Sequence, residues 1–254
     1  MTPLLINTRP SHRSAAIDQI TAVPVVSLPL LEIVSLSLSI SEQAMMTKWL
    51  TGDYHALVIT SVEAAKRALA YLGQLGVDLT TVATTMTAPI IAVGEATAKV
   101  LSARGFSVIL PAVASNEGML ALPEIATLQA SERVLIWCGV GGRRLLKDTL
   151  LAKGVQVDDV YWYQRRVPDN LELQFNHLQP LLDKHNTCVL ISSQMAYQAW
   201  RTLQHTCRYY YLTLGERLSQ LVRSQEPAAQ VAKIDTLHPD EICLAIDGLM
   251  QHTA

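Results

Sequence analysis

The chain has 254 residues, of which 50% are hydrophobic and 17% charged, and its formal net charge is −2. This length suits one large or two ordinary domains, and the composition argues against disorder. The near-neutral charge gives no sign of nucleic-acid or membrane binding. Apolar runs fall short of the roughly 18 residues that span a bilayer, and no leader peptide is recognisable at residues 1–6. We therefore expect a soluble cytoplasmic protein.

Strands and helices are expected to alternate along the first two thirds of the chain. After a strand at 4–7 come a polar, weakly helical stretch to Ile20 and an extended segment over 24–34, which Pro29 interrupts so that it bends or runs as an edge strand. A helix over 42–50 capped by Ser41 follows. The next elements are a strand–helix pair over 56–72, a strand at 89–93, a helix at 95–104, a strand at 106–110, a helix opening at 115, a strand at 133–138, a helix at 143–153 and an extended segment over 155–165.

The alternation resumes after Pro168. We expect helices at 171–184, 194–203, 216–223 and 239–251, and strands at 187–192, 208–214 and 230–234. Such alternation predicts parallel sheets with right-handed crossovers.

Two stretches more than a hundred residues apart share one pattern. In the first, a strand ends in Thr60-Ser61 and a later strand ends in Gly94-Glu; in the second, the corresponding ends are Ser192-Ser193 and Gly215-Glu. This repeat predicts two similar α/β domains with a cleft between them. Ligands of open α/β sheets bind at the carboxyl ends of the strands.

The strand at 4–7 needs partners from the segment after residue 168, which makes one domain discontinuous. The predicted fold is therefore α/β, with two domains of parallel sheets flanked by helices and joined by a two-stranded linker. We expect one domain at 1–35 with 168–254 and an inserted domain at 36–167, with 24–35 and 155–167 as linker strands. Such a linker permits hinge motion.

Several residues could carry chemistry. Gly139-Val-Gly-Gly142 lacks the full dinucleotide fingerprint, so it is interpreted as an anion cradle beside Arg143-Arg144, or equally as a tight turn with solvated arginines. Thr60-Ser61 and Ser192-Ser193 are either helix caps or ligand contacts. The four cysteines lack metal-site or C-x-x-C spacing and are expected to be buried thiols, and no metal is expected.

Aromatic residues mark the second linker strand. Alternation places Tyr161 and Tyr163 on one face, where they either pack or place a phenol at the cleft to protonate a leaving hydroxyl. Residues 209–211, all tyrosine, are interpreted as core and edge packing instead.

An ordered series of short motifs covers nearly the whole chain: Asn7-Thr8-Arg9-Pro10, Ser27-Leu-Pro29-Leu, Val58-Ile-Thr-Ser61, Ala92-Val-Gly94-Glu-Ala-Thr97-Ala98, Gly139-Val-Gly-Gly142-Arg143, Val160-Tyr-Trp-Tyr163-Gln-Arg-Arg166, Ile191-Ser-Ser193 and Leu214-Gly215-Glu. This series resembles the uroporphyrinogen-III synthase family, the cyclases of tetrapyrrole biosynthesis. The resemblance implies hydroxymethylbilane as substrate, no cofactor and a monomer, with transient contact with the preceding pathway enzyme left open. It implies ring closure to uroporphyrinogen III with loss of water and inversion of the last pyrrole ring through a spiro intermediate.

The resemblance also implies roles for individual residues. Tyr163 matches the family tyrosine thought to assist departure of the hydroxyl, and the implied substrate contacts are Arg9, Ser61, Thr97, Gly141, Gly142, Arg143, Ser193 and Gly215. The chain departs from the family pattern at Cys138, where an arginine is common, and after Gly215, where a family threonine is missing. Two alternatives stay open: a non-enzymatic ligand-binding protein that closes about a hinge, and a nucleotide-dependent enzyme using the glycine turn.

Overall fold

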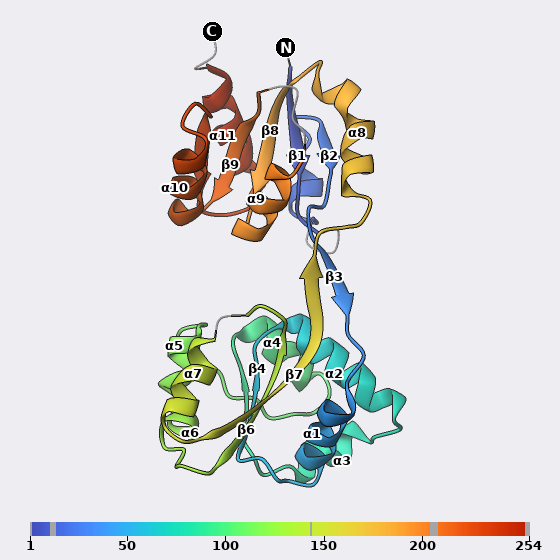
Figure 1. Cartoon of the computed structure of the whole chain (residues 1–254), viewed down its shortest axis with the longest axis vertical. Coiled ribbons are helices and arrows are strands. Elements are labelled where there is room, and N and C mark those ends of the chain that lie inside the picture. Colours follow the sequence, from blue (N-terminus) through green and yellow to red (C-terminus); the bar gives the residue numbers. More distant parts are fainter. Residues whose placement is uncertain (1, 11–13, 143, 204–207, 252–254) are drawn as a thin grey trace. The chain divides into compact units, whose positions relative to one another are not determined.

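The computed structural model describes residues 2–10, 14–142, 144–203 and 208–251. The chain divides into two compact units: unit 1 consists of Met1–Ile33 with Arg166–Ala254, and unit 2 of Val34–Arg165. Each unit contains a five-stranded sheet flanked by helices (Figure 1). The predicted α/β class is confirmed. No helix in the described ranges is long and apolar enough to cross a membrane.

All strand pairs of unit 1 are parallel. The strand order is β10-β9-β8-β1-β2, with bounds β1 Pro3–Asn7, β2 Val25–Ser27, β8 Asn186–Ile191, β9 Tyr210–Leu214 and β10 Val231–Ile234. The helices are η2 Ile17–Gln19, α8 Leu171–Leu182, α9 Gln194–Arg201, α10 Glu216–Gln225 and α11 Pro239–Gln251. The N-terminal strand pairs with a strand from the far end of the chain, since Leu5 lies opposite Cys188.

The central strands of unit 1 are buried on both faces. Along β1, Leu4 and Ile6 join one apolar cluster with α8, α9 and α10, whereas Leu5 joins another with η2 and α11. Strands covered by helices on both sides form the continuous apolar runs that made them recognisable in the sequence.

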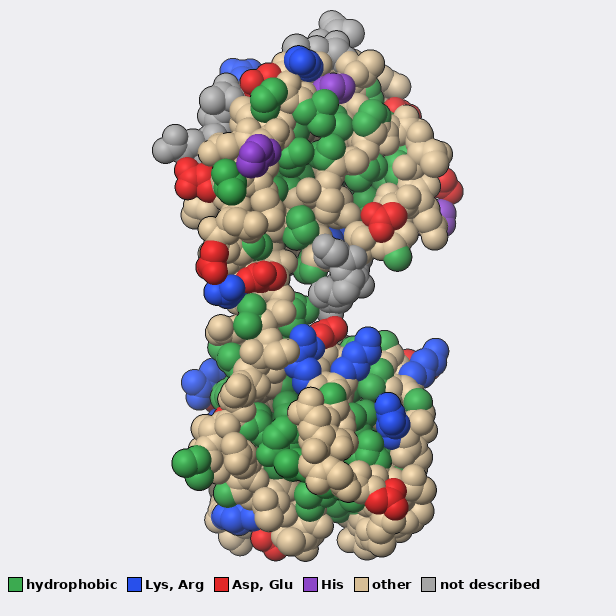
Figure 2. All heavy atoms as spheres, turned by 90° about the vertical axis from the view of Figure 1, so that its right-hand side faces the viewer, with side chains coloured by type: hydrophobic (Ala, Val, Ile, Leu, Met, Phe, Trp, Pro, Cys, Tyr) green, Lys and Arg blue, Asp and Glu red, His purple; other side chains and the backbone are tan. Residues whose placement is uncertain are grey.

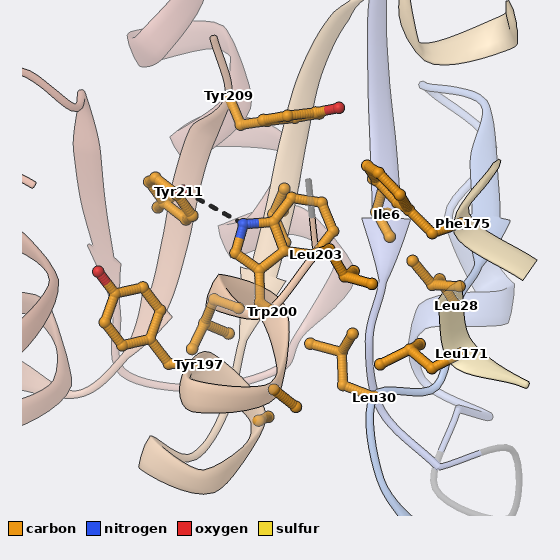
Figure 3. Packing of buried hydrophobic residues seen from close by; sticks show 14 of the residues in the cluster. Ile6, Leu28, Leu30, Leu171, Phe175, Tyr197, Trp200, Leu203, Tyr209 and Tyr211 are labelled. Carbon is orange, nitrogen blue, oxygen red and sulfur yellow. Dashed lines mark hydrogen bonds between the residues drawn. The ribbon is translucent and has the colours of Figure 1, made fainter. Parts of the chain in front are cut away.

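Trp200 lies at the centre of the first cluster (Figure 3). Tyr209 meets its ring edge-on with 5.1 Å between centroids, and Tyr211 Oη accepts a hydrogen bond from Trp200 Nε1 at 3.2 Å. The Glu226 carboxylate accepts from both Tyr197 Oη and Tyr211 Oη at 2.8 Å. The expected packing role of Tyr209 and Tyr211 is confirmed, and this polar network joins α9, β9 and the end of α10.

Unit 2 has the strand order β3-β7-β6-β4-β5. Its strands are β3 Glu32–Ser35, β4 Ala56–Ile59, β5 Ile90–Ala92, β6 Arg133–Gly139 and β7 Gln156–Arg166. Its helices are α1 Ile40–Leu50, α2 Val62–Gln74, α3 Leu79–Thr85, α4 Glu95–Ser102, α5 Asn116–Leu120, α6 Pro123–Ala126 and α7 Leu145–Ala152. Strands β4 to β7 pair in parallel. This sheet is mixed rather than parallel, because β3 runs opposite to β7 (Figure 1).

The extended segment 24–34 is interrupted as predicted: it contributes two edge strands, β2 and β3, to different sheets. Between them, Leu28 N and Leu30 N donate to the carbonyls of Asn7 and Thr8 at the end of β1. Two local predictions are wrong. Ser39 rather than Ser41 caps α1, since only Ser39 stands three residues before Glu42 to form a capping box. The expected strand 106–110 forms an isolated bridge between Ile91 and Ile109.

The connecting segments attach to each unit at the carboxyl edge of its parallel strands. In unit 1, β2 ends there and α8 starts there, because α8 leads back to the start of β8. In unit 2, β7 runs parallel to β6 and leaves at the carboxyl edge. This is also the edge at which the sequence repeat places its hydroxyls and glycines.

Candidate functional site

A cavity of about 590 Å³ lies at the carboxyl edge of the sheet in unit 2. Its walls include Thr60 and Ser61 after β4, Val93 after β5, and Cys138 and Gly139 at the end of β6. The cavity therefore occupies the position at which open α/β sheets hold ligands.

Strand β7 supplies one wall of this cavity through every second residue. Asp159, Tyr161, Tyr163 and Arg165 all line it. Trp162, between them, packs into the core on the other face against Trp137 at a centroid distance of 6.0 Å. The prediction that Tyr161 and Tyr163 share a face is confirmed.

Tyr163 is the most closely surrounded phenol of this wall, with only 2% of its surface exposed. Its hydroxyl donates to Ser61 Oγ at 3.1 Å and accepts from Arg165 Nη2 at 3.3 Å. Two guanidinium groups also lie over its ring, with Arg67 Cζ at 5.5 Å and Arg165 Cζ at 5.4 Å from the centroid. The phenol is thus held between a hydroxyl and two cations.

Gly139 makes room for this ring. It lies opposite Tyr163 in the β6–β7 register, and Val140 N donates to Tyr163 O at 2.9 Å. A Cβ at Gly139 would stand 2.4 Å from Tyr163 Cζ, far inside the ordinary contact distance of about 3.5–4.0 Å between carbons. The ring can take this position only against a glycine.

The two repeat serines are helix caps. Ser61 Oγ accepts from Ala64 N at 3.1 Å at the start of α2, and Ser193 Oγ accepts from Ala196 N at 3.2 Å at the start of α9. The capping interpretation is therefore confirmed for both. Ser61 in addition lines the cavity and bonds Tyr163.

A second polar cluster lies further along the β7 wall. Asp159 Oδ2 accepts from Lys147 Nζ at 2.5 Å and from Tyr161 Oη at 2.9 Å. Burial, followed by the hydrogen bond to Asp159, raises the pKa of Tyr161 to about 12. Burial and then the charge of Asp159 raise the pKa of the Cys138 thiol to about 12. Both groups therefore stay protonated at neutral pH.

The glycine turn contributes Gly141, Gly142 and Arg144 to the cavity lining. Gly141 has a φ of +78°, which favours glycine, and Arg144 pairs with Asp148 at 3.2 Å. Arg143 lies outside the described residues, so its proposed substrate contact remains a prediction.

The remaining predicted contacts lie elsewhere. Arg9, Ser193 and Gly215 follow β1, β8 and β9 at the carboxyl edge of unit 1, where Gly215 begins α10 with a φ of +81°. Thr97 is 3% exposed within α4 and is not among the cavity-lining residues of unit 2. The substrate roles of these four residues also remain predictions.

No pattern in the sequence assigned a role to Asp159, Lys147, Arg165 or Arg67. The alternation that links Tyr161 to Tyr163 extends to Asp159 and Arg165 and could have indicated them. Arg67 carries no comparable signal, because its position over the Tyr163 ring depends on how α2 packs against β7.

These features define a two-unit α/β protein in which the strand ends of one unit enclose a cavity with an internal phenol. A family model described as Uroporphyrinogen-III synthase HemD matches residues 13–229. The chain therefore belongs to the uroporphyrinogen-III synthase family.

Named relatives agree with this assignment. The uroporphyrinogen-III synthase of Salmonella typhimurium is 31% identical over 144 residues, covering 52% of this chain and 56% of the relative. That of Escherichia coli is 30% identical over 118 residues, covering 42% and 46%. The chain thus spans about half the length of the curated relatives it matches.

Two solved structures share the fold. A uroporphyrinogen III synthase mutant from Thermus thermophilus matches 99% of this chain and all of its own, with a TM-score of 0.62 at 13% identity. The uroporphyrinogen-III synthetase of Helicobacter pylori matches 100% of both chains, with a TM-score of 0.60 at 17% identity. At these identities the likeness supports the architecture alone.

Proposed function

We propose that this protein cyclises hydroxymethylbilane to uroporphyrinogen III with loss of water. The observation that carries the proposal is Tyr163, whose hydroxyl lies in the cavity of unit 2 between Ser61 and Arg165. Membership of the uroporphyrinogen-III synthase family supports the same reaction. Classification as a lyase, the lack of a cofactor and a cytoplasmic location belong to this proposal.

The proposed reaction does not require a strongly acidic or basic side chain. The terminal pyrrole nitrogen pushes electrons toward its hydroxymethyl carbon, the C–O bond breaks, and the oxygen leaves as water after taking a proton from Tyr163. The last ring, at the other end of the substrate, then attacks through its substituted carbon to give the spiro intermediate. The bond between that carbon and its original methylene bridge breaks, the freed methylene carbon bonds to the unsubstituted carbon of the same ring, and that carbon loses one proton.

Substrate carboxylates can be held by groups around the cavity. Arg144 and Lys147 line it with positive side chains, and Gly141 and Gly142 bring backbone N–H groups to the start of α7. Figure 2 shows Lys and Arg side chains gathered at the end of unit 2 where the connectors attach. Binding energy from remote carboxylates can stabilise the strained spiro intermediate.

Unit 1 is proposed to hold other parts of the substrate. Ser193, Gly215 and Arg9 stand at the carboxyl edge of the sheet in unit 1. In unit 2, the cavity lies at the corresponding edge of that unit's sheet. Helix starts and hydroxyls at such an edge suit carboxylate groups.

The test is turnover of freshly generated hydroxymethylbilane, with the type I and type III products separated. The unaided substrate closes to type I, so we expect type III to dominate with the protein. Tyr163→Phe should lower the rate by about 10²–10⁴-fold, as expected for loss of a general acid, while the protein stays folded.

Tyr71→Phe is the matched control, because Tyr71 packs on Trp162 in the core of the same unit. It should keep the wild-type rate. A wild-type rate for Tyr163→Phe removes Tyr163 from the chemistry. Type I product alone from the wild-type protein refutes the cyclase and leaves the ligand-binding alternative.

A further inference from the structure

Arg165 contacts Tyr163 in two ways. Its Nη2 donates to the phenol oxygen at 3.3 Å, and its Cζ lies 5.4 Å from the ring centroid. Arg165 also lines the cavity, two residues after Tyr163 on the same face of β7. The guanidinium therefore fixes both the plane of the ring and the position of its oxygen.

The other guanidinium over this ring, that of Arg67, has its own ion-pair and hydrogen-bond partners. Arg67 forms an ion pair with Glu63 one turn earlier on α2, and its Nε donates to Ser35 Oγ at 3.0 Å. Its contact with Tyr163 is with the ring rather than the oxygen. Arg67 can support the ring, but its charge is largely balanced by Glu63.

The remaining charges of the cavity are also balanced locally. Lys147 pairs with Asp159, and Arg144 pairs with Asp148. No carboxylate within the described ranges forms an ion pair with Arg165. Arg165 is thus the cavity cation whose charge is available to the Tyr163 oxygen.

We propose that Arg165 is a positioning residue for Tyr163: its guanidinium orients the phenol and stabilises the negative charge that forms on the oxygen when the proton leaves. This inference rests on the proposed function. A donor aimed at an oxygen where charge develops lowers the barrier most when it is already in place, as this one is.

The proton and electron balance is complete. The phenol proton passes to the departing hydroxyl, which takes both C–O bonding electrons and leaves as water. The phenolate keeps its hydrogen bond from Arg165 while the ring inverts. It is reprotonated by the proton that the unsubstituted carbon of the last ring releases on final closure.

The first test is kinetic. Arg165→Gln should lower kcat by about 10²-fold, the lower end of what loss of an oxyanion donor costs, with little change in KM and with type III still the product. Arg165→Lys keeps the charge and should recover part of the loss. In a Tyr163→Phe background, Arg165→Gln should cause no further loss of kcat, because the oxygen it serves is absent.

Arg133→Gln is the control, since Arg133 lies at the opposite end of the same sheet and bonds Gln156. It should leave the kinetics unchanged. Two outcomes overturn the inference. A rise in KM with unchanged kcat would make Arg165 a carboxylate-binding residue, and independent, multiplying losses in the double variant would separate it from Tyr163.

A measurement without substrate separates this inference from the proposed function. In protein with ¹³C at tyrosine Cζ, the Tyr163 signal is identified by its loss in Tyr163→Phe. Arg165→Gln should shift that signal and leave the Tyr161 signal in place. An unmoved Tyr163 signal refutes the contact even where the protein turns over hydroxymethylbilane. A moved signal in a protein without turnover upholds the contact and refutes the function.

Discussion

Gly139→Ala tests the packing on which the Tyr163 site depends. The added Cβ would lie at 2.4, 2.6 and 2.7 Å from three carbons of the Tyr163 ring. Ordinary carbon contacts are about 3.5–4.0 Å, so the ring has to retreat by about 1 Å. The retreat moves the phenol oxygen away from Ser61 Oγ and Arg165 Nη2, which hold it at 3.1 and 3.3 Å.

Two effects should follow together. Overpacking a well-packed site costs about 1–3 kcal/mol of stability. A catalytic group displaced by about 1 Å loses about 10²-fold in rate. We therefore expect Gly139→Ala to lower kcat for type III formation by about 10²-fold and to lower the urea unfolding midpoint.

A double variant that combines Gly139→Ala with Tyr163→Ala tests whether the ring causes the loss of stability. The three atoms nearest to the new methyl group all belong to the Tyr163 ring, so Gly139→Ala should cost much less stability in the Tyr163→Ala background. Gly73→Ala is the control, because nothing lies within 4 Å of the added atom and Gly73 stands in α2. It should keep activity and gain up to about 1 kcal/mol. Wild-type kcat and stability in Gly139→Ala would refute the close approach.

Two predictions concern stability in unit 1. Tyr211→Phe removes the acceptor of Trp200 Nε1 and one of two phenols on Glu226, and should cost about 1–3 kcal/mol by urea unfolding. Tyr210→Phe, one residue earlier on β9, is its control, and equal effects would contradict the network. Burial raises the pKa of Cys188 from 9.0 to about 12, so the stability its protonated thiol contributes is lost as pH rises from about 9 toward 12. Cys188→Ala should flatten that alkaline decline, and an unchanged slope would show that Cys188 does not cause it.

Strand positions were the most predictable part of this fold. Buried parallel strands read as continuous apolar runs, and β4, β6 and β8 follow the expected ranges closely. The misplaced features depend on contacts that no local pattern encodes. Residues 106–110 are apolar enough for a strand, yet only Ile109 reaches β5.

The site was predictable where alternation or the repeat reached it. Alternation along β7 placed Tyr161 and Tyr163 together, and the repeat indicated Ser61. Arg67 was not predictable, because a helix residue meets a strand residue only through tertiary packing. Gly139 was recognised in the sequence as part of a glycine cluster. The structure requires glycine there because the Tyr163 ring on the neighbouring strand occupies the space of a Cβ, and not because of the turn that follows.

The sequence repeat is visible in only part of each unit because one unit is a circular permutation of the other. The sheet order β7-β6-β4-β5 of unit 2 corresponds to β2-β1-β8-β9 of unit 1. β4 and β8 both lead to serine caps, and β5 and β9 both lead to glycine caps. The counterparts of β6 and β7 stand at the start of the chain, so the repeat cannot be followed through them in sequence order.

This correspondence also separates the roles of the two units. The β6–β7 register sets Gly139 opposite Tyr163, and the matching β1–β2 register sets Asn7 opposite Ser27. Unit 1 therefore has a serine where unit 2 has the phenol, and a buried asparagine side chain where unit 2 has a glycine that leaves room for the Tyr163 ring. Both units have capped helix starts, but at this strand pair the phenol stands in unit 2. The two carboxyl edges therefore differ in their chemistry at this position, although they share their sheet order.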